Sequence, residues 1–364
     1  MSANAIHSAE DARRIAKRRL PWMVFDYIDG AAGAETGAAR NRAALDAITL
    51  RPRILRDVSE RSLTTTLFGA TAKRPFGIAP MGMCNLSAPG ADLMLARLAA
   101  QYQVPHGVST VASTPLEKII EVAQGHAWFQ LYFSGDGSGT FKLVERAKAA
   151  GYKTLVLTVD VPEVGRRPRE LRHGFKMPFK IGPRQFADFA LHPRWSLNTL
   201  IKGKPTMANF DMPGYTFDRT ESRAGATWDT LKKLREMWPG NLVVKGVLDI
   251  EDAVKLKNAG VDGIQVSSHG ARQLESAPAP IEALSQIRTE LGTQYPLFFD
   301  SGIRSGEDVL CALNQGADFV FLGRILQFAL AAGHEAGLHK LWETISEEMS
   351  IAMAQIGQTG IEVR

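Results

Sequence analysis

Short apolar runs alternate with longer amphipathic stretches along most of the chain. The runs that we expect to form strands, rich in β-branched or aromatic residues, span 76–80, 104–110, 126–133, 154–160, 241–247, 263–268, 296–302 and 318–324. Stretches with helical spacing, such as 89–103 and 249–260, follow them. Alternating strands and helices form βαβ units around a parallel sheet. Eight units predict an α/β fold in which the sheet closes as a (β/α)8 TIM barrel.

The alternative is an open, doubly wound sheet, which usually has fewer strands and a glycine fingerprint after the first one. The first predicted strand continues as FGIAPMGMC (76–84), which contains no GxGxxG motif. We therefore predict a single barrel domain over residues 1–364. Ser8 and Asp11 have the spacing of a capping box, so we expect a lead helix that starts there and ends at Pro21.

A long segment, residues 172–227, separates the fourth predicted strand from the fifth. Its centre, residues 180–210, is rich in proline, aromatic and basic residues, with Asp188 as its one acidic residue. The basic residues are Lys180, Arg184, Arg194, Lys202 and Lys204. An insertion of this length after a barrel strand is typical of a lid, a binding loop or a mobile segment.

The composition is that of an ordinary globular protein, with 45% hydrophobic and 22% charged residues. A net charge of +5 is compatible with an anionic substrate, cofactor or membrane surface, and no aromatic-interleaved basic module indicates nucleic acid. Cys84 and Cys311 are far apart and form no CxxC motif, so we expect reduced thiols, no metal site and a cytoplasmic protein. The N-terminal residues lack the apolar region of a signal peptide.

Polar residues follow the predicted strands at the end where barrel enzymes carry their chemistry. They are Ser109, Gln130, Tyr132, Thr158, Asp160, Lys245, Ser267, His269, Asp300, Arg304 and Arg324. So many polar side chains facing one mouth would be costly without partners, so we expect a polar ligand to fill it. Lys245 has three interpretations: a structural or solvent-exposed cation, a Schiff-base lysine, or a fixed cation beside an electron-rich cofactor ring.

Two glycine–arginine pairs indicate a phosphate site. DSGIR (300–304) and LGR (322–324) end the last two predicted strands. Glycine lets backbone N–H groups approach a phosphate, and phosphate sites in barrels typically lie after these strands.

A histidine and an arginine, three residues apart, end the sixth predicted strand. With arginines and a carboxylate such as Asp160 at the same rim, His269 is better explained as a base than as a structural residue. The alternative for Asp160 is a turn cap. Arg272 suits bidentate capture of a substrate carboxylate. A base, a carboxylate-binding arginine and a phosphate-bearing cofactor predict oxidation next to a carboxylate.

The stretch SSHGARQLE (267–275) resembles the signature S-N-H-G-[AG]-R-Q of the FMN-dependent α-hydroxy acid oxidase and dehydrogenase family. This family includes glycolate oxidase, lactate oxidase, mandelate dehydrogenase and the respiratory L-lactate dehydrogenases. Further matches occur in order along nearly the whole chain: LPWMVFDYIDGAA, RPRIL, IAPMG, FQLY, LTVDVPEVGRR, LVVKGV, DSGIR and LGR. The resemblance implies bound FMN and oxidation of a 2-hydroxy acid, in which His269 removes a proton and flavin N5 receives two electrons.

The resemblance also implies roles for individual residues. The substrate carboxylate would be held by Tyr27, Arg167 and Arg272. Tyr132 would lie beside the substrate hydroxyl, and Asp160 would pair with the catalytic His269. The FMN contacts that it implies are Pro80, Met81, Gly82, Ser109, Gln130, Thr158, Lys245, Ser267, Asp300, Gly302, Arg304, Gly323 and Arg324.

Four positions carry information beyond the family signature. Ser268 stands where the family usually has asparagine, and Ser301 where it usually has a second glycine. Val111 stands where glycolate oxidases have tryptophan, which leaves room for a substrate side chain larger than hydrogen. Gly82 matches a position that is commonly glycine in the dehydrogenases and alanine in the oxidases.

The inserted segment closely resembles that of bacterial mandelate dehydrogenases, where it contacts the membrane. We therefore expect an (S)-2-hydroxy acid dehydrogenase that acts on a lactate-like or mandelate-like substrate and passes electrons to quinone. The family resemblance also implies a homotetramer. We expect the protein to be peripheral on the inner face of the membrane through residues 180–210. The alternatives are an oxygen-reducing oxidase, a Schiff-base aldolase using Lys245, and a lid without a membrane role.

Overall fold

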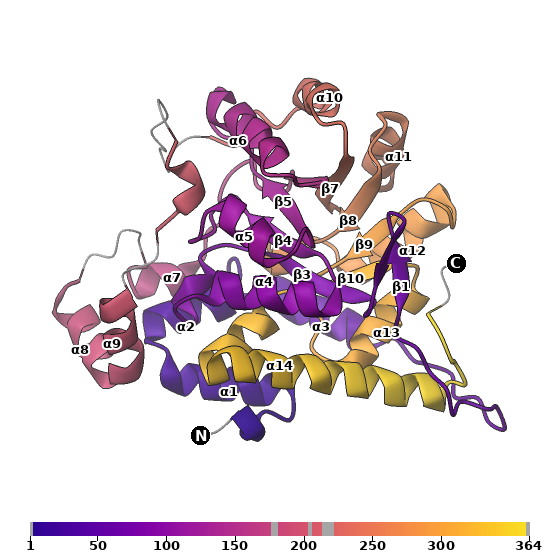
Figure 1. Cartoon of the computed structure of the whole chain (residues 1–364), viewed down its shortest axis with the longest axis horizontal. Coiled ribbons are helices and arrows are strands. Elements are labelled where there is room, and N and C mark those ends of the chain that lie inside the picture. The colour runs from indigo at the N-terminus through magenta and orange to yellow at the C-terminus, as the bar shows by residue number, and fades with distance from the viewer. Residues whose placement is uncertain (1–2, 176–180, 203–205, 213–221, 362–364) are drawn as a thin grey trace.

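Eight parallel strands close into a barrel in the order β10-β3-β4-β5-β6-β7-β8-β9 (Figure 1). The computed structural model describes residues 3–175, 181–202, 206–212 and 222–361. The barrel strands are β3 (Phe76–Met81), β4 (His106–Ser109), β5 (Ala127–Leu131), β6 (Thr154–Thr158), β7 (Asn241–Val247), β8 (Gly263–Val266), β9 (Leu297–Phe299) and β10 (Phe319–Leu322). The predicted TIM barrel is confirmed, and each strand coincides with a predicted run to within one residue or lies inside it.

A short hairpin lies at the amino-terminal end of the barrel and was not predicted. Its strands are β1 (Thr65–Leu67) and β2 (Ala70–Ala72). Phe68 lies at the turn between them. The centre of its ring lies 5.7 Å from that of Trp128 in β5 and 5.5 Å from that of Phe298 in β9. The aromatic side chains close this end of the barrel, so a ligand has access from the opposite end.

Helices follow the strands and cover the outside of the barrel (Figure 1). They are α4 (Ala91–Tyr102), α5 (Leu116–Val122), α6 (Ser138–Ala149), α10 (Trp228–Met237), α11 (Ile250–Asn258), α12 (Pro280–Leu291), α13 (Gly306–Asn314) and α14 (Arg324–Gln355). Each presents apolar residues to the sheet because apolar positions recur with helical spacing. The long α14 has non-helical backbone angles at Gly333 and His334, and it runs beside the lead helix.

Three helices precede the barrel: α1 (Ala9–Arg19), α2 (Trp22–Asp29) and α3 (Thr36–Asp46). The predicted start of α1 is confirmed, since the Ser8 hydroxyl accepts a hydrogen bond from the Asp11 amide at 3.1 Å. Pro21 follows the end of α1 as expected. Helices α2 and α3 bring their residues to the carboxyl ends of the barrel strands.

The inserted segment contains α8 (Pro183–Leu191) and α9 (Pro193–Lys202), preceded by α7 (Pro168–Arg172). Figure 1 shows α8 and α9 as a pair beside α1 and α2, outside the ring of barrel helices. Asp188 accepts a hydrogen bond from the Trp22 amide at 3.1 Å, and the Trp195 indole donates to the Leu86 carbonyl at 2.8 Å. Lys180 and Lys204 lie outside the described residues. Across the part of the chain that is described, none of the helices is long and apolar enough to cross a membrane.

Candidate active site

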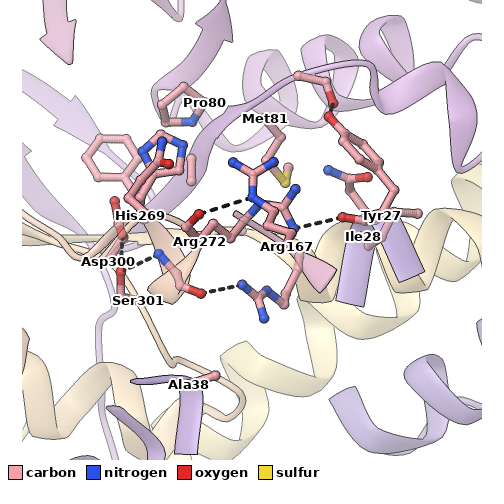
Figure 2. Close-up of a pocket in the computed structure, with 18 of the residues that line it drawn as sticks. Tyr27, Ile28, Ala38, Pro80, Met81, Arg167, His269, Arg272, Asp300 and Ser301 are labelled. Atoms are coloured by element: carbon pink, nitrogen blue, oxygen red, sulfur yellow. Dashed lines mark hydrogen bonds between the residues drawn. The ribbon is translucent and has the colours of Figure 1, made fainter. Parts of the chain in front are cut away.

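A cavity of about 390 Å³ lies at the carboxyl ends of the strands (Figure 2). Predicted site residues that line it are Tyr27, Pro80, Met81, Gly82, Val111, Tyr132, Arg167, Lys245, His269, Arg272, Asp300, Gly302, Arg304, Gly323 and Arg324. The remaining predicted residues lie at the same strand ends but not on the cavity wall: Ser109, Gln130, Thr158, Asp160 and Ser267. These five side chains form hydrogen bonds with other residues at the strand ends. For example, Gln130 Nε2 donates to Thr158 Oγ1 at 3.0 Å.

His269 is held between a carboxylate and a phenol. Its Nδ1 lies 3.0 Å from Asp160 Oδ1, and its Nε2 lies 3.4 Å from the Tyr132 hydroxyl. When Nδ1 carries the proton and donates a hydrogen bond to Asp160, Nε2 is the unprotonated ring nitrogen and can accept a proton on the cavity side. Burial lowers the pKa of His269, so the ring is neutral at neutral pH and able to accept a proton.

A glycine provides the space that Asp160 occupies. Burial opposes ionisation of Asp160, but His269 and Lys245 outweigh burial and lower its pKa. Gly246 lies directly against this carboxylate, and a Cβ there would be 2.5 Å from Asp160 Cγ. Gly246 also has φ +102°, a conformation that favours glycine. The carboxylate that orients His269 therefore depends on a glycine in β7.

Lys245, the residue before Gly246, is buried beside a carboxylate and a hydroxyl. Its Nζ donates to the Ser267 hydroxyl at 2.9 Å and lies 3.4 Å from Asp300 Oδ2. Burial favours the neutral amine, but Asp300 and Asp160 outweigh burial and raise the pKa of Lys245. A Schiff base requires a free amine, so this environment favours the fixed cation among the three interpretations of Lys245.

Arg324 is a partly buried cation that lines the same cavity. It donates to the carbonyl oxygens of Asp29 at 3.2 Å and Gly270 at 2.6 Å, and it forms no ion pair with a described residue. Burial and the nearby Arg272 lower the pKa of Arg324 to about 10. A Cβ at the preceding residue, Gly323, would meet only Ala79, at 4.0 Å. A guanidinium that forms no direct ion pair with a described residue and lies next to open backbone suits a phosphate group.

Two arginines share one internal carboxylate near Tyr27. Arg272 donates to Glu170 at 2.8 Å, and Arg167 approaches the same oxygen at 3.5 Å. Arg272 also donates to the carbonyl oxygens of Tyr27 at 2.8 Å and Gly30 at 2.7 Å. In Figure 2, Arg167 and Arg272 lie between His269 and Tyr27. Arg167 and Arg272 together carry two positive charges against the one negative charge of Glu170, so a net positive charge remains for a substrate carboxylate. Arg272 nevertheless uses several of its N–H groups in bonds within the protein, which its predicted role did not include.

Sequence reasoning missed several residues on the cavity wall. Glu170 belongs to α7, three residues after Arg167, and this spacing was the one available signal. Asn41 reaches the cavity from α3, which no strand-end pattern indicates. Arg223 comes from the end of the insertion and places its guanidinium carbon 4.6 Å from the centre of the Tyr132 ring. Arg166, next to Arg167 in the sequence, is exposed and does not line the cavity.

A sequence profile of the FMN-dependent dehydrogenase family matches residues 16–363. The chain belongs to this family. The L-lactate dehydrogenase of Pseudomonas paraeruginosa is 39% identical, with 98% of this chain and 96% of that protein covered. The L-lactate dehydrogenase of Xanthomonas campestris is 40% identical over 97% of this chain and 94% of its own.

Solved structures support the same assignment. The crystal structure of the monotopic membrane protein (S)-mandelate dehydrogenase superposes with a TM-score of 0.91 at 36% identity, covering 98% of this chain and 96% of its own. Mandelate oxidase with benzoyl-formic acid gives a TM-score of 0.84 at 36% identity, covering 97% and 95%. The chain is thus an FMN-dependent oxidoreductase of the 2-hydroxy acid dehydrogenase type.

The cavity residues fit FMN. The phosphate would be held by Arg324 and Arg304, which line the cavity beside Gly302 and Gly323. Gly302 has φ +107°, and a Cβ there would meet Leu45 at 2.9 Å. The residues that would hold the ring are Pro80 and Met81 at the end of β3, with Gly82 after them, and Lys245 would supply a positive charge in the same cavity.

Proposed function

We propose that the protein oxidises an (S)-2-hydroxy acid to the 2-oxo acid, with His269 as the base. The observation that carries this proposal is the pairing of His269 with Asp160 at 3.0 Å, beside two arginines and a buried lysine. When bound, FMN supplies the two-electron acceptor. The remaining chemistry, which consists of substrate binding and proton transfer, is carried by the protein side chains.

Substrate binding begins with the carboxylate. Arg167 and Arg272 hold it by charge-assisted hydrogen bonds, taking over from Glu170, and the Tyr27 hydroxyl lies on the same side. With the carboxylate fixed there, the α-carbon and its hydroxyl face Tyr132 and His269. His269 Nε2 then takes a proton from the substrate. Asp160 stabilises the imidazolium that forms, in the role that a carboxylate has beside a histidine base.

The substrate side chain points toward Val111 and Gly82. A Cβ at Gly82 would lie 2.5 Å from Val111 Cγ2, so the glycine keeps space open beside the valine. A tryptophan at residue 111 would fill that space. The absence of such a ring favours a methyl or phenyl substituent, which is consistent with relatives named for lactate and for mandelate.

The α8–α9 pair supports electron transfer to a membrane quinone. Large apolar side chains are exposed on it: Phe186 69%, Leu191 67%, Leu197 57%, Leu200 80% and Ile201 79%. Arg184, Arg194 and Lys202 are exposed on the same helices. Apolar side chains next to basic ones match the interface of an anionic bilayer. We infer that this pair docks on the membrane surface, where quinone accepts the electrons, and that oxygen is the lesser acceptor.

Vesicle binding tests the membrane part of this proposal. The double variant Leu200→Glu and Ile201→Glu should lose co-sedimentation with phosphatidylglycerol vesicles. The matched control is Ile54→Glu and Leu55→Glu, because those residues are 82% and 100% exposed but lie outside the insertion. Equal vesicle binding by both double variants would contradict docking through α8–α9. Light scattering would test the predicted homotetramer.

The oxidation is tested by anaerobic bleaching of the flavin with a panel of (S)-2-hydroxy acids. We expect bleaching by (S)-lactate, (S)-mandelate or both, little by glycolate, and reoxidation faster with a quinone analogue than with air. A flavin that no 2-hydroxy acid bleaches would overturn the proposed function. If air reoxidised the reduced flavin faster than the quinone analogue did, the protein would be an oxidase instead.

A further inference from the structure

The loop that carries His269 has an unusual backbone. Three consecutive residues have positive φ: His269 at +56°, Gly270 at +63° and Ala271 at +60°. Residues other than glycine rarely adopt this conformation, because Cβ then approaches the carbonyl oxygen. A loop with two such residues persists only if its surroundings determine it. The orientation of the His269 ring therefore depends on whatever holds this loop.

Serine hydroxyls accept the backbone N–H groups of the loop. The Ser301 hydroxyl accepts from the amides of Ser268 at 3.2 Å and Gly270 at 3.0 Å. The Ser267 hydroxyl accepts from the His269 amide at 2.9 Å. The Ser268 hydroxyl accepts from the Ala271 amide at 3.3 Å and from the Asn41 side chain at 2.8 Å. Four successive amides are thus bound by three serines.

Ser301 has the most demanding position of the three. It is 7% exposed and has φ +88°, where glycine would fit without strain. Its hydroxyl also donates to Asp300 Oδ1 at 2.7 Å. A hydroxyl provides one donor and two acceptor positions, so all of its hydrogen-bonding capacity is used. Figure 2 shows Ser301 beside Asp300, on the same side of the cavity as His269.

We propose that Ser301 is a positioning residue for His269, through its hydrogen bonds to the loop of residues 268–271. This inference rests on the proposed function, in which His269 is the base. Ser301 stabilises the left-handed loop, and Asp300 fixes the direction of the Ser301 hydroxyl. The role also explains why a serine stands at a backbone position that favours glycine.

Hydrogen–deuterium exchange tests the loop without relying on activity. In Ser301→Ala, the amides of Ser268 and Gly270 lose their acceptor and should exchange about tenfold faster. The amides of His269 and Ala271 keep theirs and should change less. Fragment ions that resolve single amides provide the measurement. Unchanged exchange at Ser268 and Gly270 would overturn the proposal.

Kinetics test the consequence for His269. Ser301→Gly relieves the backbone strain but removes the hydroxyl, so it should fold well and still reduce its flavin about tenfold or more slowly. KM and the flavin midpoint potential should stay at their wild-type values, because the arginines and Lys245 are untouched. The matched control is Ser305→Ala, which also removes a hydroxyl that accepts a backbone amide, from Asp308 at 3.1 Å, but outside this loop.

Two kinetic outcomes would overturn the positioning role. One is flavin reduction by Ser301→Gly at the wild-type rate. The other is a slow rate that is fully accounted for by lost FMN or by a shifted potential, which would make Ser301 a cofactor-binding residue. Failure of the proposed function would be distinct, since no 2-hydroxy acid would bleach the wild-type flavin. The exchange experiment would then decide on Ser301 alone.

Discussion

The substitution Gly246→Ala tests how closely catalysis depends on Asp160. A methyl group at Gly246 would lie 2.5 Å from Asp160 Cγ and 2.9 Å from its Oδ2. Nonbonded atoms prefer separations of about 3.5–4.0 Å, so the carboxylate must move by about 1 Å. A displacement of that size in a catalytic group costs roughly a hundredfold in rate. We expect the rate of flavin reduction to fall by about that factor, as measured by anaerobic stopped-flow absorbance.

The variant should also change the pH dependence. Asp160 raises the pKa of His269, so moving the carboxylate away should shift the acid limb of the rate profile to lower pH. Gly151→Ala is the matched control, because Gly151 has φ +90° and nothing lies within 4 Å of its added Cβ. Both variants carry a comparable backbone strain, about 1–2 kcal/mol, but only Gly246→Ala adds a steric contact with Asp160. Equal flavin-reduction rates in the two variants would refute the reasoning.

Three further predictions follow from the charges around the cavity. Burial lowers the pKa of His269 below 6.5, so in steady-state pH profiles kcat/KM should fall only when the pH drops below 6.5 and the base becomes protonated. A fall in kcat/KM centred above pH 6.5 would contradict a base that is neutral at neutral pH. Glu170→Gln should lower KM about three- to tenfold with kcat nearly unchanged, because Arg167 and Arg272 no longer share an internal anion; a raised KM in steady-state assays would argue that Glu170 positions the arginines. Arg324→Met should weaken FMN binding in fluorescence titrations, because it removes a cation from the cavity wall beside Gly323; an unchanged affinity for FMN would show that Arg324 does not hold the phosphate.

The barrel and most of the site were predictable because both arise from local patterns. Each strand is a short apolar run, and a parallel barrel brings the carboxyl ends of all its strands together. His269, Lys245 and Asp300 could therefore be assigned to one cavity from their places along the chain. The family signature added individual roles that spacing alone did not provide.

What the sequence did not reveal depends on contacts between distant segments. Asn41 reaches the cavity only because α3 packs over the strand ends. Glu170 pairs with an arginine 102 positions away, so its role is invisible in a local pattern. Ser268 and Ser301 were noted as departures from the family, but their direct hydrogen bond, between the Ser268 amide and the Ser301 hydroxyl, appears only in three dimensions.

The central claim is that His269, oriented by Asp160, removes the substrate proton. The most direct test is anaerobic flavin reduction by His269→Ala that has been purified with FMN bound. The account predicts that the variant keeps its yellow flavin and binds substrate, yet shows no bleaching at (S)-2-hydroxy acid concentrations that saturate the wild-type protein. Bleaching of His269→Ala at a rate near that of the wild type would contradict the account.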